Sequence, residues 1–67
     1  MFVGKKNYGL LYHDKQDYYS VIEDEGLISA GNTRDEAIMF LAQLGLSFAQ
    51  RKLLYQWSHR NPNKVVR

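Results

Sequence analysis

The stretch DYYSVIEDEGLISAGNTRDEAIMFL, residues 17–41, holds most of the signals that decide the fold. Its runs YYSVIE (18–23) and LISA (27–30) are short and apolar, and their local period is closer to two than to 3.6, which favours strands. Gly26 can adopt a positive φ at no steric cost, so the acidic segment EDEG predicts a hairpin between the two runs. The segment after Gly31 then changes from strand signals to helix signals.

The first predicted helix follows this hairpin. Thr33 and Glu36 have the spacing of a capping box, in which the Thr hydroxyl accepts from the amide of Glu36 and the Glu carboxylate reaches back. The helix therefore begins near Arg34, and Gly45 is a candidate for its C-terminal cap. Apolar residues recur at spacings of three and four, which predicts one buried face made of Ala37, Phe40, Leu41 and Leu44.

A second helix is predicted by the same signature. Ser47 and Gln50 repeat the capping spacing, and the helix should run to about Arg60 because Asn61 and Pro62 stop it. Its predicted apolar side is Ala49, Leu53, Leu54 and Trp57. Its predicted opposite side is basic and aromatic, with Arg51, Lys52, Tyr55 and His59.

The run YGLLYH (8–13) supplies a third strand, with Tyr8, Leu10 and Tyr12 on one face. The sequence thus predicts one α+β domain over residues 1–67, of order β-β-β-α-α. In it a three-stranded antiparallel meander is covered on one face by two helices. Residues 1–7 are a candidate for an additional edge strand, and residues 61–67 are predicted to be a frayed basic tail.

The composition limits how the chain can be stabilised. A chain of 67 residues buries a core that gives only about 3–5 kcal/mol of net stability, and the absence of cysteine excludes disulfides and thiolate catalysis. Self-association is the remaining device, so we expect a homodimer. No run is apolar enough for a signal peptide or a membrane span, so we expect a cytoplasmic protein without a membrane partner.

Charge divides unevenly along the chain. Residues 1–46 carry four basic and seven acidic side chains, whereas residues 47–67 carry five basic and no acidic ones. Such polarity favours an acidic partner or a polyanion. The candidate contacts with nucleic acid or a partner are Arg51, Lys52, Tyr55, His59, Arg60 and Lys64, although basic residues also gather at helix C-termini because of the helix dipole.

Aromatic residues indicate a second kind of surface, because tyrosine and tryptophan anchor many protein interfaces. In so small a domain they can equally form the core, which we expect for Trp57. The candidate residues for a protein interface are Tyr8, Tyr12, Tyr18 and Tyr19.

Catalysis, cofactor binding and metal binding are not predicted. His13 and His59 lie far apart in the sequence, with no serine nucleophile signature between them. His13 with Asp14 and Asp17 is typical of a polar turn, and the carboxylates of residues 23–25 are typical of a solvated hairpin tip. The glycines do not have the spacing of a phosphate-binding loop. We therefore expect a protein that is not an enzyme.

The pattern over residues 8–44 resembles the core of HicB-like antitoxin domains. In that family an aromatic-rich strand, a turn and a third strand ending in Gly-Asp-Thr or similar lead into a helix containing Glu-Ala. Gly31, Asn32, Thr33, Glu36 and Ala37 match this pattern. The segment EDEG replaces the usual proline-containing connection, and no separate C-terminal DNA-binding domain follows.

The resemblance implies a module that binds a protein partner and often dimerises, and it does not extend to binding of an operator. The sequence thus predicts a small regulatory protein of bacterial or phage type that occupies a partner protein. Nucleic-acid binding through the basic C-terminal helix and tail is the alternative.

Overall fold

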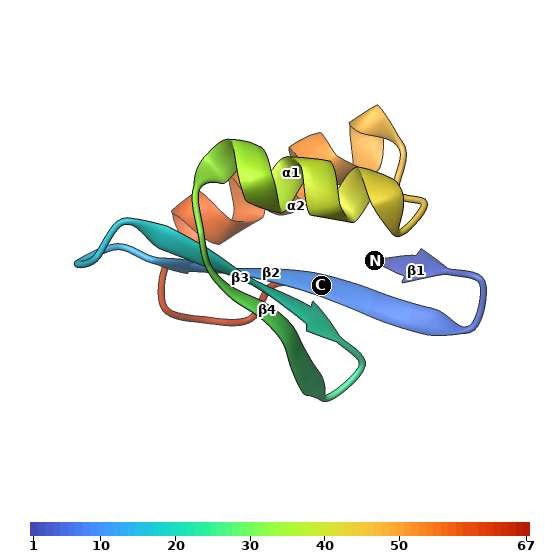
Figure 1. Cartoon of the computed structure of the whole chain (residues 1–67), viewed down its shortest axis with the longest axis horizontal. Helices are drawn as coiled ribbons and strands as arrows, with labels where there is room; N and C mark the ends of the chain where they lie inside the picture. Colours follow the sequence, from blue (N-terminus) through green and yellow to red (C-terminus); the bar gives the residue numbers. More distant parts are fainter.

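The structure, a computed structural model, describes all 67 residues and has two layers, a sheet and a pair of helices on one of its faces (Figure 1). The four strands are antiparallel, and their order in the sheet is the order in the chain. The elements are β1 (Phe2–Val3), β2 (Lys6–His13), β3 (Tyr18–Glu23), β4 (Gly26–Asn32), α1 (Arg34–Gln43) and α2 (Phe48–Arg60). Neither helix has the length and apolar content that crossing a bilayer requires.

The α+β class agrees with the sequence, but the predicted count of three strands is wrong. Phe2 and Val3 form a fourth strand, which pairs with Asn7 and Lys6 at the start of β2. The chain can reverse this tightly because Gly4 has a φ of 63°, a left-handed conformation that glycine adopts without strain. A strand of two residues is too short to show a hydrophobic period, so the sequence marks residues 1–7 only as a candidate edge strand.

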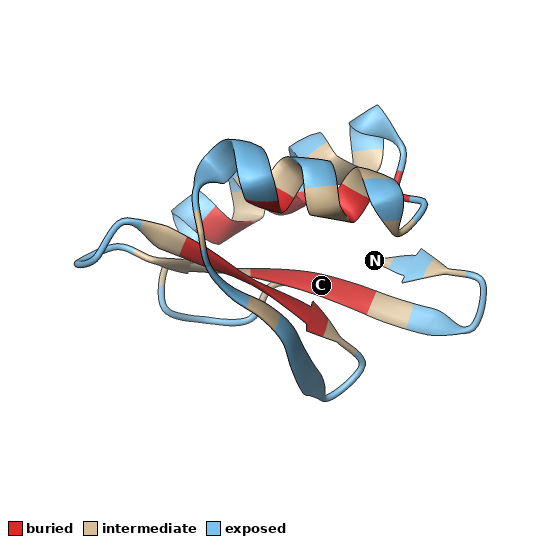
Figure 2. Cartoon of the chain, viewed as in Figure 1, coloured by how far each residue is buried: buried red, intermediate tan, exposed pale blue.

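The centre of the sheet is regular and its outer strand is not. β2 and β3 pair without interruption from Tyr8 opposite Glu23 to His13 opposite Tyr18. The pairing of β3 with β4 shifts register twice, and β4 is mostly exposed at the free edge of the sheet (Figure 2). The helices therefore cover the middle of the sheet, and β4 is left largely open to solvent.

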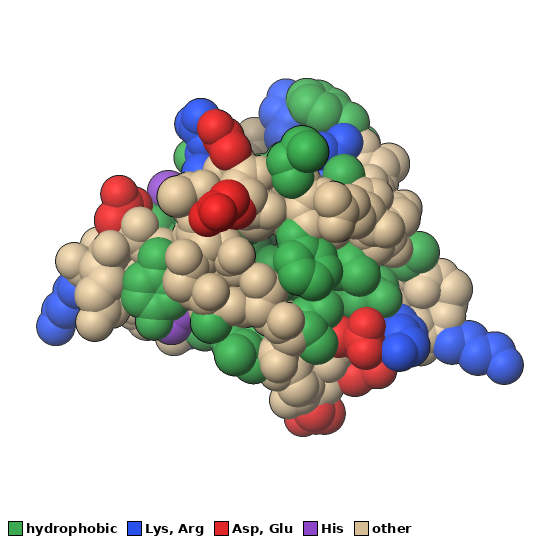
Figure 3. All heavy atoms as spheres, in the orientation of Figure 1, with side chains coloured by type: hydrophobic (Ala, Val, Ile, Leu, Met, Phe, Trp, Pro, Cys, Tyr) green, Lys and Arg blue, Asp and Glu red, His purple; other side chains and the backbone are tan.

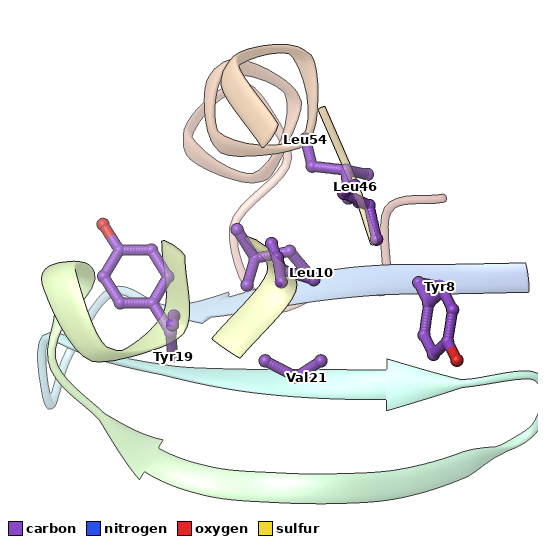
Figure 4. Packing of buried hydrophobic residues seen from close by; sticks show 8 residues of the cluster. Tyr8, Leu10, Tyr19, Val21, Leu46 and Leu54 are labelled. Atoms are coloured by element: carbon purple, nitrogen blue, oxygen red, sulfur yellow. The ribbon is translucent and has the colours of Figure 1, made fainter. Parts of the chain in front are cut away.

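The core lies between the middle strands and the helices. Side chains from both layers meet there, and six of the eight are labelled in Figure 4. The cluster is Tyr8, Leu10, Tyr19, Val21, Ala37, Leu41, Leu46 and Leu54. Tyr8 and Tyr19 are only 6% and 4% exposed, so these two rings serve packing.

Both predicted helix starts are confirmed. The Thr33 hydroxyl accepts from the Glu36 amide at 3.2 Å, and the Glu36 carboxylate accepts from the Thr33 amide at 2.8 Å. Ser47 and Gln50 make the same reciprocal pair at 3.2 and 2.8 Å. Each capping box satisfies amides that the first helical turn leaves without a partner.

The buried face of α2 is rotated from the predicted one. Leu54 and Ser58 are its fully buried residues, whereas Leu53 is 40% exposed and Ala49 is exposed. Ser58 is tolerated in the interior because its hydroxyl donates to the carbonyl oxygen of Tyr55 at 2.8 Å. This rotation turns Tyr55 toward the sheet, where it packs against the core cluster.

The C-terminal segment is paired with the sheet, in contrast to the predicted frayed tail. Leu10 and Val66 exchange two backbone hydrogen bonds of 2.9 and 3.0 Å, and the Asn63 amide donates to the Tyr12 carbonyl oxygen at 2.7 Å. The tail thus continues along the edge of β2 beyond β1. It passes so close to Gly9 that a Cβ at this position would lie 2.8 Å from the Val66 oxygen.

Candidate functional site

A groove of about 170 Å³ lies between the two helices. Phe48, Arg51, Lys52 and Tyr55 have helical spacings of three and four, so they project from one side of α2. Arg34 and Ile38, four residues apart on α1, line the opposite wall. Three of the six lining residues are cations, and none is a carboxylate. The surface that lines the groove is nevertheless entirely apolar, because these side chains contribute their carbon atoms to it. The groove itself is therefore suited to an apolar or aromatic group.

The aromatic residue at the mouth of this groove is Phe48. Its side chain is 73% exposed, although burial of a phenylalanine ring is normally favourable by about 1.5–3 kcal/mol. The guanidinium carbon of Arg51 lies 5.9 Å from the centre of the Phe48 ring. In Figure 3, basic and hydrophobic side chains gather over the start of α2 at the top of the molecule. Phe48 and Arg51 together present a flat apolar face beside a positive charge.

A larger polar cleft of about 420 Å³ adjoins the groove. The two hollows have Arg34 and Tyr55 in common among their lining residues. The cleft lies between the β2–β3 hairpin, the start of α1 and the last turns of α2. Its remaining lining residues are Asp17, Tyr19, Thr33, Asp35 and His59.

Packed aromatic rings form the wall of the cleft beside the sheet. The His59 ring stacks on Tyr12 with a centroid distance of 4.2 Å and lies 4.5 Å from Tyr55. A hydrogen bond joins the Tyr19 hydroxyl to His59 Nε2, and the Tyr12 hydroxyl donates to Asp17 at 2.7 Å. These contacts hold His59 and Asp17 in place without filling the cleft.

The protonation of these groups is set by their neighbours. Burial, followed by the proximity of Tyr55, raises the pKa of Tyr19, and the hydrogen bond to Asp17 raises the pKa of Tyr12. The Tyr55 hydroxyl, followed by the Asp35 carboxylate, raises the pKa of Arg34. At neutral pH the phenols are therefore uncharged and Arg34 is cationic.

The candidate contact residues from the sequence separate into three groups. Arg51, Lys52 and Tyr55 line the groove, and His59 lines the cleft. Arg60 and Lys64 are exposed and lie outside both hollows. The candidate interface tyrosines also divide, because Tyr8 and Tyr19 are in the core, Tyr12 is half-buried against it, and Tyr18 stacks on His13 at 4.1 Å.

Sequence reasoning missed Arg34, Ile38 and Phe48 in the groove, and Asp17, Thr33 and Asp35 in the cleft. The helical spacing of Phe48 from Arg51, Lys52 and Tyr55 is a signal that could have found it. The contribution of α1 has no such signal, because it depends on how the two helices pack.

The acidic and histidine side chains do not converge on a metal site. His13 hydrogen-bonds to Ser20 at 3.0 Å, Asp14 accepts from Asn63 at 3.0 Å, and Asp17 accepts from Tyr12. The three side chains of the β2–β3 turn thus have three different partners.

No protein-family model, curated protein or solved structure matches this chain. The resemblance to HicB-like antitoxin domains therefore stays a prediction.

Proposed function

We propose that the protein is a small cytoplasmic binding protein, without a catalytic role, that binds single-stranded nucleic acid along the groove between α1 and α2. The observation that carries this proposal is an apolar groove lined by the rings of Phe48 and Tyr55, whose other lining residues include three cations, Arg34, Arg51 and Lys52, and no carboxylate. Cations that follow the phosphates and rings that stack on bases are the two features by which proteins hold single strands.

The exposure of Phe48 supports a single strand over a duplex. Bases in a duplex are already stacked on each other, so an exposed ring at the rim of a narrow groove has little to contact there. An unpaired base can stack on it, and such stacking contributes about 1–3 kcal/mol per base.

The test is a titration of labelled single- and double-stranded oligonucleotides at two salt concentrations. Replacing Arg51 and Lys52 by alanine should weaken single-strand binding about tenfold at low salt, equal to about 1.4 kcal/mol. The difference should shrink as salt rises, because each phosphate contact contributes through released counterions.

The matched control is the Arg60→Ala and Lys64→Ala double variant, which removes the same charge outside the groove. Equal loss in both double variants would mean that net charge, and not the groove, governs binding. Absence of binding by the wild-type protein at low salt would refute the proposal.

Binding of a protein partner is a second proposal, favoured by the free edge of β4. This strand carries no charged residue, and two of its own residues, Leu27 and Ile28, are 59% and 38% exposed. An edge strand offers unpaired amides and carbonyls to an added strand from a partner protein or a second copy. The measurement that tests it is the mass of the protein in solution, with and without a charge introduced on this edge.

A further inference from the structure

We infer that the groove between α1 and α2 receives one pyrimidine base of the bound strand by its apolar edge, and that it favours thymine over uracil through the thymine 5-methyl group. Since this inference rests on the proposed function, it names only the base that the single-strand site prefers. The preferred ligand is therefore single-stranded DNA that contains thymine.

The surface of the groove offers close contact but no hydrogen bond. It is entirely apolar, although Arg34, Arg51 and Lys52 are among the lining residues, so the charged ends of these side chains lie outside it. A polar atom that enters such a groove loses its hydrogen bonds to water and gains none, which is unfavourable. The groove therefore selects the least polar part of a nucleotide.

That part is the C5–C6 edge of a pyrimidine. This edge lies on the side of the ring away from N3, so the pairing groups of the base can stay in water while the edge is buried. The corresponding edge of a purine carries N7, a hydrogen-bond acceptor. Thymine has a methyl group at C5, where uracil has only a hydrogen atom.

The size of the groove also suits the edge of one base. Sites for whole small organic ligands usually measure about 300–1,000 Å³. The groove, at about 170 Å³, is too small for a complete nucleotide. The sugar and phosphate of the inserted nucleotide therefore stay outside, beside the rim.

The apolar residues of the groove come from both helices. Phe48, at the mouth, and Tyr55 project from one side of α2, and Ile38 lies on the opposite wall. An inserted edge thus meets an aromatic ring on one side and a branched aliphatic chain on the other. Phenylalanine is one of the residues that contact the thymine methyl group in DNA complexes. Removal of one methyl group from water strengthens binding about fourfold.

Charge around the groove favours a nucleic-acid strand as the source of the apolar group. The Arg34 side chain is 63% exposed, Lys52 is exposed, and no carboxylate lines the groove. The phosphates on either side of an inserted base would meet these cations outside the apolar surface. The cations thus attract the strand, and the groove discriminates among its bases.

The experiment measures the affinity of wild-type protein for fluorescent homo-oligonucleotides of thymidine and deoxyuridine, equal in length, at low salt. The two strands share one backbone and differ only by the methyl group. We expect the thymidine strand to bind about fourfold more tightly. Strands of 5-methyldeoxycytidine and deoxycytidine should give a similar ratio, because their methyl group lies on the same edge.

The test variant is Phe48→Ala, which opens one side of the groove, and its preference for thymidine should fall to near equality. The matched control is Phe2→Ala. It removes a phenylalanine of similar exposure, 65% against 73%, from β1, outside the groove, and should keep the preference. Thermal melting of all three proteins checks their folding.

A second readout needs no variant. In the complex of wild-type protein with the thymidine strand, nuclear Overhauser contacts should join the thymine methyl protons to side-chain protons of Ile38 and Phe48. These contacts place the methyl group in the groove directly.

Three results would overturn the inference and leave the proposed function standing. One is equal affinity of wild type for the thymidine and deoxyuridine strands, with binding still dependent on Arg51 and Lys52. The second is a preference that Phe48→Ala keeps, and the third is a thymine methyl group whose contacts lie outside the groove. Absence of binding to every strand would overturn the inference and the proposed function together, and would leave the groove to an acidic protein partner.

Discussion

At the scale of single residues, the absence of a side chain at Gly9 lets the C-terminal segment pack closely against β2. A Cβ there would lie 2.8 Å from the Val66 oxygen and 2.9 Å from Arg67 Cγ, closer than real Cβ contacts. Gly9→Ala should therefore push the C-terminal segment off β2 and lower the free energy of unfolding by about 1–3 kcal/mol, as overpacking does. Denaturant midpoints and hydrogen exchange of the Leu10 and Val66 amides measure this.

The control for that substitution is Gly26→Ala. A Cβ at Gly26 would meet its nearest atom at 3.7 Å, an ordinary contact, so this change should alter the midpoint little. If Gly9→Ala is as mild as Gly26→Ala, the tail does not contribute to stability. The sequence contains no signal for this approach, because a glycine inside a strand is equally compatible with a bulge.

At the scale of elements, the caps were predictable and the rotation of α2 was not. Capping boxes are local, so the spacings of Thr33 with Glu36 and of Ser47 with Gln50 locate both helix starts. The buried face depends on tertiary packing, which buries Ser58 in preference to Leu53. A ranking by hydrophobicity cannot anticipate a serine whose hydroxyl is satisfied within its own helix.

The cap of α2 also has a predicted effect on the groove. Ser47→Ala removes the acceptor for the Gln50 amide and should lower the free energy of unfolding by about 1 kcal/mol. Because Phe48 and Arg51 lie in the turn that this cap holds, nucleic-acid affinity should fall as well. Ser47→Thr keeps the hydroxyl and should preserve both. Thermal melts and oligonucleotide titrations give the readouts, and unchanged values for Ser47→Ala would contradict the prediction.

At the scale of the whole molecule, the parts that sequence reasoning missed are held by contacts distant in the chain. β1 and the C-terminal segment both pair with the same edge of β2. This edge therefore brings together residues near both ends of the sequence. The groove and the cleft likewise combine α1 with α2 or the β2–β3 hairpin. The sequence predicted Arg51, Lys52 and Tyr55 of the groove but missed Phe48. Periodicity describes one element at a time, so it gives no sign of their companions on α1.

The opposite edge of the sheet is the place where we expect a second copy to pair. Antiparallel pairing of β4 with β4 of a second copy would give one continuous sheet with both helix layers on the same face, because the two-fold axis is perpendicular to the sheet. Two copies of the groove would then face the same way and could hold one strand together. The bulges in β4 shorten any such ladder, so we expect a weak dimer whose population rises with concentration.

Light scattering over a range of protein concentrations tests this pairing. Leu27→Lys places a charge on the β4 edge and should keep the protein monomeric at concentrations where wild type dimerises. Met39→Lys is the matched control, because Met39 is 62% exposed against 59% for Leu27 and lies on α1, outside β4. Equal effects of the two lysines would place the contact elsewhere or attribute it to net charge. A monomeric mass for wild type at every concentration would rule out the homodimer and leave the β4 edge to a different protein partner.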